Sequence, residues 1–83
     1  MFIETKNKEE LLEKLEENRN ENAVIHFNCH NCDDEQVTYE DEADDQLEQF
    51  KKYGYLVLHI DCTNCGSRIG MLSPEYIQGI EIV

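Results

Sequence analysis

Two short cysteine motifs constrain this chain more than any other feature. They read FNCHNC at residues 27–32 and IDCTNC at residues 60–65, and together they contain all four cysteines. A Cys-x-x-Cys pair turns both of its thiolates toward one point, and two such pairs supply four sulfurs to one tetrahedral metal ion. A closed ligand set of this kind stabilises structure and leaves no coordination position for a substrate. The predicted metal ligands are Cys29, Cys32, Cys62 and Cys65.

The chain is short enough for a metal to matter to its folding. Its 83 residues predict one domain, residues 1–83, near the lower limit at which an apolar core suffices. No apolar run approaches the roughly 18 residues that cross a bilayer. The first residues do not have the basic and apolar regions of a signal peptide. We therefore expect a cytoplasmic location, where reduced thiols favour metal binding over a disulfide.

The charge of the chain is strongly negative. Nineteen acidic residues oppose seven Lys and Arg residues, which gives a formal net charge of −12. Four thiolates around one Zn²⁺ would add two further negative charges. Such a field repels nucleic acid and anionic membranes and attracts basic partners, so we expect direct binding to neither DNA, RNA nor membrane. Solubility and adaptation to high salt are alternative explanations of the acidity.

Apolar spacing predicts two helices. Residues 8–18 form the first, with Asn7 as its N-cap and Leu11, Leu12 and Leu15 on one face. Residues 42–53 form the second, and Gly54 follows it where a left-handed C-terminal cap is expected.

Short apolar or alternating runs predict the strands. Residues 23–27 lead into the first cysteine motif and residues 37–39 return from it, while residues 55–60 and 69–72 flank the second motif. Residues 55–60 are apolar on both faces, which predicts a central strand. Ser73-Pro74-Glu75 indicates a turn or helix start, and Ile80–Val83 form a last strand. If that strand is exposed, it offers an edge for pairing in a homodimer.

The cysteine motifs, called knuckles below, resemble those of zinc ribbons. The resemblance implies Zn²⁺ as the ion and an α+β fold: a small antiparallel β-sheet with an N-terminal helix and a second helix in an acidic insertion, residues 33–54, between the knuckles. Iron rubredoxins also use two Cys-x-x-Cys knuckles, typically with Gly after the first pair and Pro inside the second. Here Asp33 follows the first pair and Thr63-Asn64 lie inside the second, so zinc is preferred.

Other residues near the knuckles allow further interpretations. A thioredoxin-like redox motif needs a single Cys-x-x-Cys at a helix N-terminus, which this pattern does not supply. His30 lies inside the first knuckle and is a ligand in place of a cysteine, a weak pH-dependent contact or an exposed turn residue. His26 and His59 precede their knuckles by the same spacing and are expected to be neighbours on paired strands. Asn31 and Asn64 are expected to tighten the loops around sulfur through backbone amides, or to be simple turn residues.

Within the insertion, residues 33–49 contain nine carboxylates and no Lys or Arg. Like charges four residues apart on a helix destabilise it by a few tenths of a kcal/mol per pair. The run is either a solvated helix face or a surface that binds a basic partner. The nine candidate partner-binding residues are Asp33, Asp34, Glu35, Glu40, Asp41, Glu42, Asp44, Asp45 and Glu48.

Size, charge and the lack of catalytic motifs resemble those of small acidic bacteriophage inhibitors that mimic DNA. The resemblance implies a protein-binding module that occupies the basic surface of a DNA-binding protein, such as a nucleoid protein, a polymerase or a nuclease. The alternative is a zinc-ribbon module that docks on a transcription or translation assembly, with incidental acidity. We expect no enzymatic activity, because the chain has no glycine-rich phosphate loop and no Ser/His/Asp or Cys/His set that would pair a free nucleophile with a general base.

Overall fold

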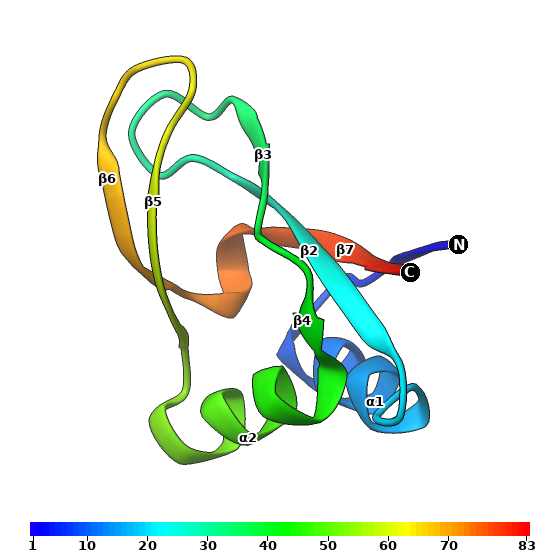
Figure 1. Cartoon of the computed structure of the whole chain (residues 1–83). Helices are drawn as coiled ribbons and strands as arrows, with labels where there is room; N and C mark the ends of the chain where they lie inside the picture. Colours follow the sequence, from blue (N-terminus) through cyan, green and yellow to red (C-terminus); the bar gives the residue numbers. More distant parts are fainter.

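Two helices and two antiparallel sheets make up the fold. The computed structural model describes residues 1–83 (Figure 1). Its elements are β1 Phe2–Glu4, α1 Lys8–Glu17, β2 Asn22–Asn28, β3 Glu35–Val37, β4 Asp41–Glu42, α2 Ala43–Tyr53, β5 Leu56–Asp61, β6 Arg68–Leu72, the 3₁₀ turn η1 Pro74–Tyr76 and β7 Ile77–Ile82. The predicted α+β class, with one helix before the knuckles and one between them, is confirmed. Neither helix has the length and apolar character needed to cross a membrane.

The larger sheet has the strand order β1-β7-β2-β3, and β4 pairs with the other end of β2. The smaller sheet is the β5–β6 hairpin alone. The prediction of a central strand at residues 55–60 is therefore wrong, because β5 has a partner on one side only. The expected exposed edge at Ile80–Val83 is also wrong: β7 lies between β1 and β2, so it offers no free edge for the predicted homodimer.

The helix predictions are confirmed at their ends. Asn7 caps α1, and its Oδ1 accepts a hydrogen bond from the Glu10 backbone N–H at 2.8 Å. Gly54 ends α2 in the left-handed conformation, with φ of 82°, which glycine adopts without the steric penalty of a Cβ atom. Both signals are local, so the sequence defines them without knowledge of the tertiary structure.

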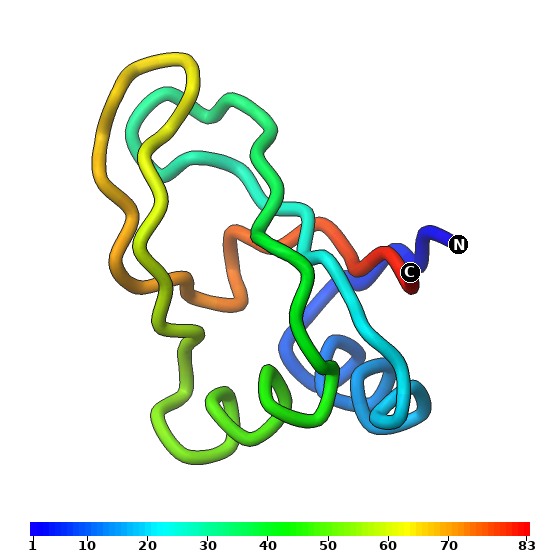
Figure 2. Tube along the Cα trace, viewed as in Figure 1, coloured from blue at the N-terminus to red at the C-terminus, as the bar shows by residue number.

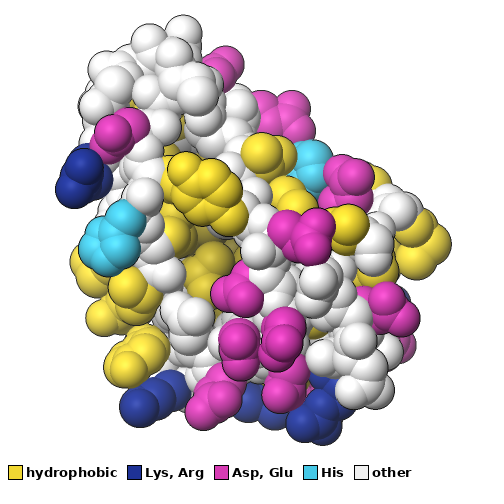
Figure 3. Space-filling model, viewed as in Figure 1, with side chains coloured by type: hydrophobic (Ala, Val, Ile, Leu, Met, Phe, Trp, Pro, Cys, Tyr) yellow, Lys and Arg dark blue, Asp and Glu magenta, His cyan; other side chains and the backbone are white.

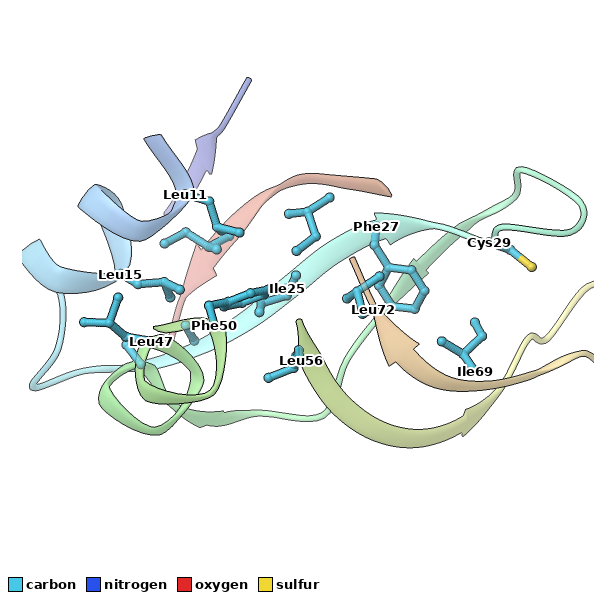
Figure 4. Close-up of a cluster of buried hydrophobic side chains, with 14 of the residues drawn as sticks. Leu11, Leu15, Ile25, Phe27, Cys29, Leu47, Phe50, Leu56, Ile69 and Leu72 are labelled. Carbon is cyan, nitrogen blue, oxygen red and sulfur yellow. The ribbon is translucent and has the colours of Figure 1, made fainter. Parts of the chain in front are cut away.

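The apolar core fills the space between the helices and the inner face of the larger sheet. Leu11 and Leu15 of α1 and Phe50 of α2 meet Ile25 of β2, all at most 1% exposed (Figure 4). Phe27 continues the core toward the knuckles, and Cys29 lies beyond it (Figure 4). Burial of a large apolar side chain contributes about 1.5–3 kcal/mol, so this cluster is the main apolar contribution to folding.

The two ends of the chain lie side by side in the larger sheet (Figure 2). The three-residue strand β1, which the sequence did not predict, pairs antiparallel with β7, and Ile3 lies opposite Ile80. Gly79 is the position at which this pairing is closest. A Cβ atom there would overlap the carbonyl oxygen of Ile3 and lie 2.7 Å from Cζ of Phe2, so the strands approach each other only because residue 79 has no side chain.

Candidate metal centre

The four cysteine sulfurs converge on one point between the two hairpins. All four Sγ atoms lie within 4.8 Å of one another. Sγ of Cys29 is 3.7 Å from Sγ of Cys65, and Sγ of Cys32 is 3.5 Å from Sγ of Cys62. Four thiolates at about 2.3 Å from a tetrahedral ion have sulfurs about 3.8 Å apart, whereas a disulfide requires about 2.05 Å. The quartet therefore fits a metal ion, and the cysteines are free.

The backbone builds the two knuckles in the same way. In the first, Asp33 N–H donates to the Cys29 carbonyl at 2.9 Å; in the second, Gly66 N–H donates to the Cys62 carbonyl at 3.0 Å. Asp33 and Gly66 both have positive φ, 61° and 76°. This conformation turns the chain back after the second cysteine of each pair. The two cysteine motifs, which are similar in sequence, are thus similar in backbone geometry as well.

Backbone amides surround the sulfurs as expected. Asn31 N–H donates to Sγ of Cys29, and Asn64 N–H donates to Sγ of Cys62, each at 3.4 Å. The Asn31 side-chain amide also lies 3.5 Å from Sγ of Cys65. Such hydrogen bonds stabilise the negatively charged thiolate, and the thiolate is the form of cysteine that binds metal.

Cys65 is the exposed ligand of the quartet. Sγ of Cys65 lies 3.3 Å from Oγ of Ser67, to which the thiol donates a hydrogen bond; once the thiol is ionised, the Ser67 hydroxyl donates to the thiolate instead. This hydrogen bond, together with that from the Asn31 side chain, lowers the pKa of the Cys65 thiol from 9.0 to about 5. The thiolate is therefore the form present at neutral pH.

Gln36 links the two knuckles, a role that sequence reasoning missed. Its side chain is buried, and Oε1 accepts hydrogen bonds from the Thr63 backbone N–H at 3.3 Å and the Thr63 hydroxyl at 3.2 Å. Its Nε2 donates to Asp34 at 2.9 Å. The side chain of β3 thus holds the second knuckle against the first. Only the tertiary structure reveals this role, because Gln36 and Thr63 are distant in sequence.

The histidines lie outside the sulfur cluster. His30 is exposed and meets the ring of Tyr76 edge-on at 6.4 Å, and the metal-competent group contains the four cysteines alone. The predicted pairing of His26 with His59 is wrong, because β2 and β5 belong to different sheets. His26 instead lies between two carboxylates, with ring nitrogens 3.4 Å from Glu35 and 3.0 Å from Glu81.

The nine predicted partner-binding carboxylates form two groups rather than one row. Three lie on the first knuckle and β3: Asp33, Asp34 and Glu35. The other six lie around β4 and α2, where Figure 3 shows acidic side chains gathered on one face. Within the second group, Asp41, Asp45 and Glu48 line one shallow depression of about 220 Å³. We call these three residues the acidic face.

Two of the nine carboxylates have neighbours that compensate for their negative charge, which the sequence does not indicate. Arg19, which follows α1, lies 3.2 Å from Asp44 and forms an ion pair with it. The Asn22 side chain donates to Glu40 at 2.9 Å. The exposed pair contributes at most about 1 kcal/mol. The tertiary fold thus supplies Asp44 with a basic neighbour, whereas the acidic face forms no ion pair within the chain, although Lys52 lines the same depression.

Comparisons with protein-family models, curated proteins and solved structures found no match, so the functional interpretation of this chain depends on its own geometry.

Proposed function

We propose that the protein is a zinc-stabilised binding module whose acidic face binds the basic surface of a DNA-binding protein, as a DNA mimic. The observation that carries the proposal is the grouping of Asp41, Asp45 and Glu48 around one depression, where Lys52 is the one basic neighbour and none of the three carboxylates forms an ion pair within the chain. Three carboxylates beside one lysine leave this depression with a net negative charge, which a basic partner would compensate. The module acts by occupying its partner and has no catalytic step.

Zn²⁺ is the ion that the donor set favours. Four thiolates are soft ligands, and a tetrahedral set of four sulfurs is typical of structural zinc, with iron as the alternative. Cys29, Cys32, Cys62 and Cys65 would hold the ion, which would supply structural support rather than reactivity. Such a site is formed in a compartment that keeps thiols reduced, which supports a cytoplasmic location.

Packing of α2 on the apolar core holds the acidic face in place. α2 carries Asp45 and Glu48, which are three residues apart and therefore lie on the same side of the helix. The helix packs through Leu47 and Phe50 onto the core. A carboxylate array held in place loses little conformational entropy on binding, so the charges can compete with the evenly spaced phosphates of DNA.

Competition with DNA tests the proposal. The protein is added to complexes of DNA with a panel of nucleoid proteins, RNA polymerase and restriction nucleases, and release of DNA is measured by electrophoresis. We expect release from at least one panel member at about 50 mM salt and little release at about 200 mM salt, because screening weakens charge attraction. No release from any member would overturn the proposal.

A matched pair of variants assigns the effect to the acidic face. The triple variant Asp41→Asn, Asp45→Asn, Glu48→Gln should abolish release of DNA. The control variant Glu9→Gln, Glu13→Gln, Glu16→Gln removes the same number of charges from exposed positions of α1. It should retain most of the activity. Equal loss in both variants would mean that net charge alone acts.

A second candidate function, docking on a transcription or translation assembly, is favoured by exposed apolar side chains. Met71 of β6 is 64% exposed and Tyr76 of η1 is 38% exposed, and both line one depression with His30. Binding through these side chains would persist at the salt concentration that abolishes DNA mimicry. The variant Met71→Ser, Tyr76→Ser would remove this binding and leave DNA competition unchanged.

A further inference from the structure

A groove runs between the β3–β4 segment and β5. It consists of two depressions of about 470 and 210 Å³ that share Tyr39, and we call it the interstrand groove. Figure 3 shows apolar side chains in the hollow between these strands, with acidic side chains along its border. Tyr39 is 79% exposed, Val37 is 51% exposed and Val57 is 44% exposed. Apolar side chains with this exposure on both sides of one groove are typical of a binding surface.

The walls of the interstrand groove are free strand edges. β3 has β2 as its only partner, and β5 has β6 as its only partner. The backbone N–H of Val57 faces away from β6, because it donates to Oε1 of Gln49 at 3.0 Å. A flexible side chain thus occupies the position that a neighbouring strand would take. An unpaired strand edge is a template for another extended chain.

The floor of the groove contains an unsatisfied acceptor. Gln46 of α2 is 1% exposed and lines the groove. Its Nε2 donates to the Ala23 carbonyl at 3.1 Å, while its Oε1 has no hydrogen-bond partner. Buried polar atoms nearly always have partners, so this acceptor is open to a donor from a water molecule or from an occupant of the groove.

Charge selects the occupant. Glu35 and Asp61 border one half of the groove, and Glu40 and Asp41 border the other half. A second copy of this chain would bring another net charge of −12 to the same edge, which repels self-association. Apolar walls between acidic borders instead fit an extended segment in which basic and apolar side chains alternate.

We propose that the interstrand groove binds an extended basic peptide segment of a partner protein as a strand added to the free edge of β5. The Gln49 side chain moves aside, and the backbone N–H of Val57 donates to a carbonyl of the peptide. Apolar side chains of the peptide contact Val37, Tyr39 and Val57, and its Lys or Arg side chains face the bordering carboxylates. This proposal shares with the proposed function the premise that the partner is basic and one residue, Asp41, which belongs to the acidic face and also borders the groove.

A synthetic peptide tests strand addition. The probe is a fluorescein-labelled ten-residue peptide of alternating Lys and Val, titrated with the full-length metal-loaded protein and followed by fluorescence anisotropy. Two further peptides carry backbone N-methyl groups on every Lys or on every Val, with side chains and charge retained. We expect at least one methylated peptide to bind at least about tenfold more weakly, because methylation blocks main-chain pairing. Binding of all three with equal affinity, or of none, would overturn the proposal.

Variants of the protein place the peptide in the groove. Tyr39→Ser with Val57→Ser should weaken binding by about tenfold or more, whereas the control Met71→Ser with Tyr76→Ser should leave it within about threefold. All four side chains are exposed, so both variants are expected to fold, and circular dichroism melts check this. In ¹⁵N-edited NMR spectra, the peptide should shift the Val57 amide and the Gln49 side-chain amide. Equal effects of the two variants, or unshifted resonances, would contradict the groove.

One more variant separates the two proposals. Asp45→Asn with Glu48→Gln neutralises the acidic face outside the groove. It should reduce competition with DNA while peptide binding stays within about threefold. A variant that loses both activities together would contradict a separate groove. Peptide binding without any DNA competition would overturn the proposed function alone, and DNA competition without peptide binding would overturn the groove alone.

Discussion

The two ends of the molecule are stabilised by different means. At the helical end, Leu11, Leu15, Ile25 and Phe50 exclude water from a continuous apolar core (Figure 4). At the knuckle end, residues 29–37 and 60–68 contain only three buried side chains: Cys29, Gln36 and Cys62. A chain of 83 residues provides apolar side chains for one core and not for two. The comparison shows why sulfur ligands and a bridging glutamine hold the other end.

Of the changes considered for the two ends of the molecule, removal of the metal should reduce stability the most. Structural zinc contributes about 10–16 kcal/mol of binding free energy, similar to the whole stability of a small domain. We therefore expect chelation, or the variant Cys62→Ser, to abolish the cooperative thermal transition seen by circular dichroism. His30→Ser changes a residue of the first knuckle that lies outside the sulfur cluster, and it should leave metal content and melting unchanged. A chelated protein that melts like the untreated protein would contradict the proposed role of the metal.

Truncation of a core side chain tests the helical end separately. Phe50 is 1% exposed, so Phe50→Ala should lower the free energy of unfolding by about 3–5 kcal/mol through lost burial and a cavity. Lys51→Ala, at the next and exposed position of α2, should change it by less than about 0.5 kcal/mol. Urea denaturation measures both, and elemental analysis of the folded fraction should still find one metal ion per chain. Loss of metal from folded Phe50→Ala protein would show that the two ends are not separable.

Asp33 and Gly66 of the knuckles both have a left-handed backbone conformation, and substitutions at these two positions should change the free energy of unfolding in opposite directions. Gly66→Ala introduces a Cβ atom at a φ of 76° and should cost about 1 kcal/mol. Asp33→Gly relieves the same conformation at a φ of 61° and should stabilise the protein by less than about 1 kcal/mol. Urea denaturation of the metal-loaded variants measures the difference. Effects of the same sign would mean that the repeated backbone geometry does not control stability.

The smallest expected effect concerns pH, because Cys65 is exposed. Its lowered thiol pKa stabilises the folded state fully above pH 9.0, the unfolded value, and this contribution is lost as pH falls through about 5. Protons also compete with metal for the thiolate. Ser67→Ala removes the largest cause of the lowered pKa and should therefore move metal release to higher pH. A colorimetric zinc indicator measures the midpoint, and Ser73→Ala, distant in sequence from the sulfurs, should leave it unchanged.

The cysteine quartet and the helices were predictable because their signals are local. The spacing of Cys29 with Cys32, repeated in the second knuckle, defines the ligand set wherever the chain later runs. Asn7 and Gly54 define helix ends through their own backbone preferences. The structure adds that all four sulfurs reach one point.

The strand order was not predictable in the same way. The run at residues 55–60 is apolar on both faces, and an apolar run alone does not distinguish a buried strand from one wall of an exposed groove. Val57 illustrates this, since it is 44% exposed on β5. The strand β1 has three residues, too few to show periodicity, and it is defined by pairing with β7. Gln36 and Gln46 gave no sequence signal, because their partners are distant along the chain.

Strand β1 can pair with β7 only because residue 79 is glycine and carries a hydrogen atom where other residues carry a side chain. Any larger substituent there would meet the Ile3 carbonyl and the Phe2 ring, so strand β1 would have to leave its place. Its departure would uncover the outer edge of β7, the strand that otherwise has neighbours on both sides. The methyl group of an alanine at position 79 would thus leave an unpaired strand edge on β7, and such edges promote aggregation.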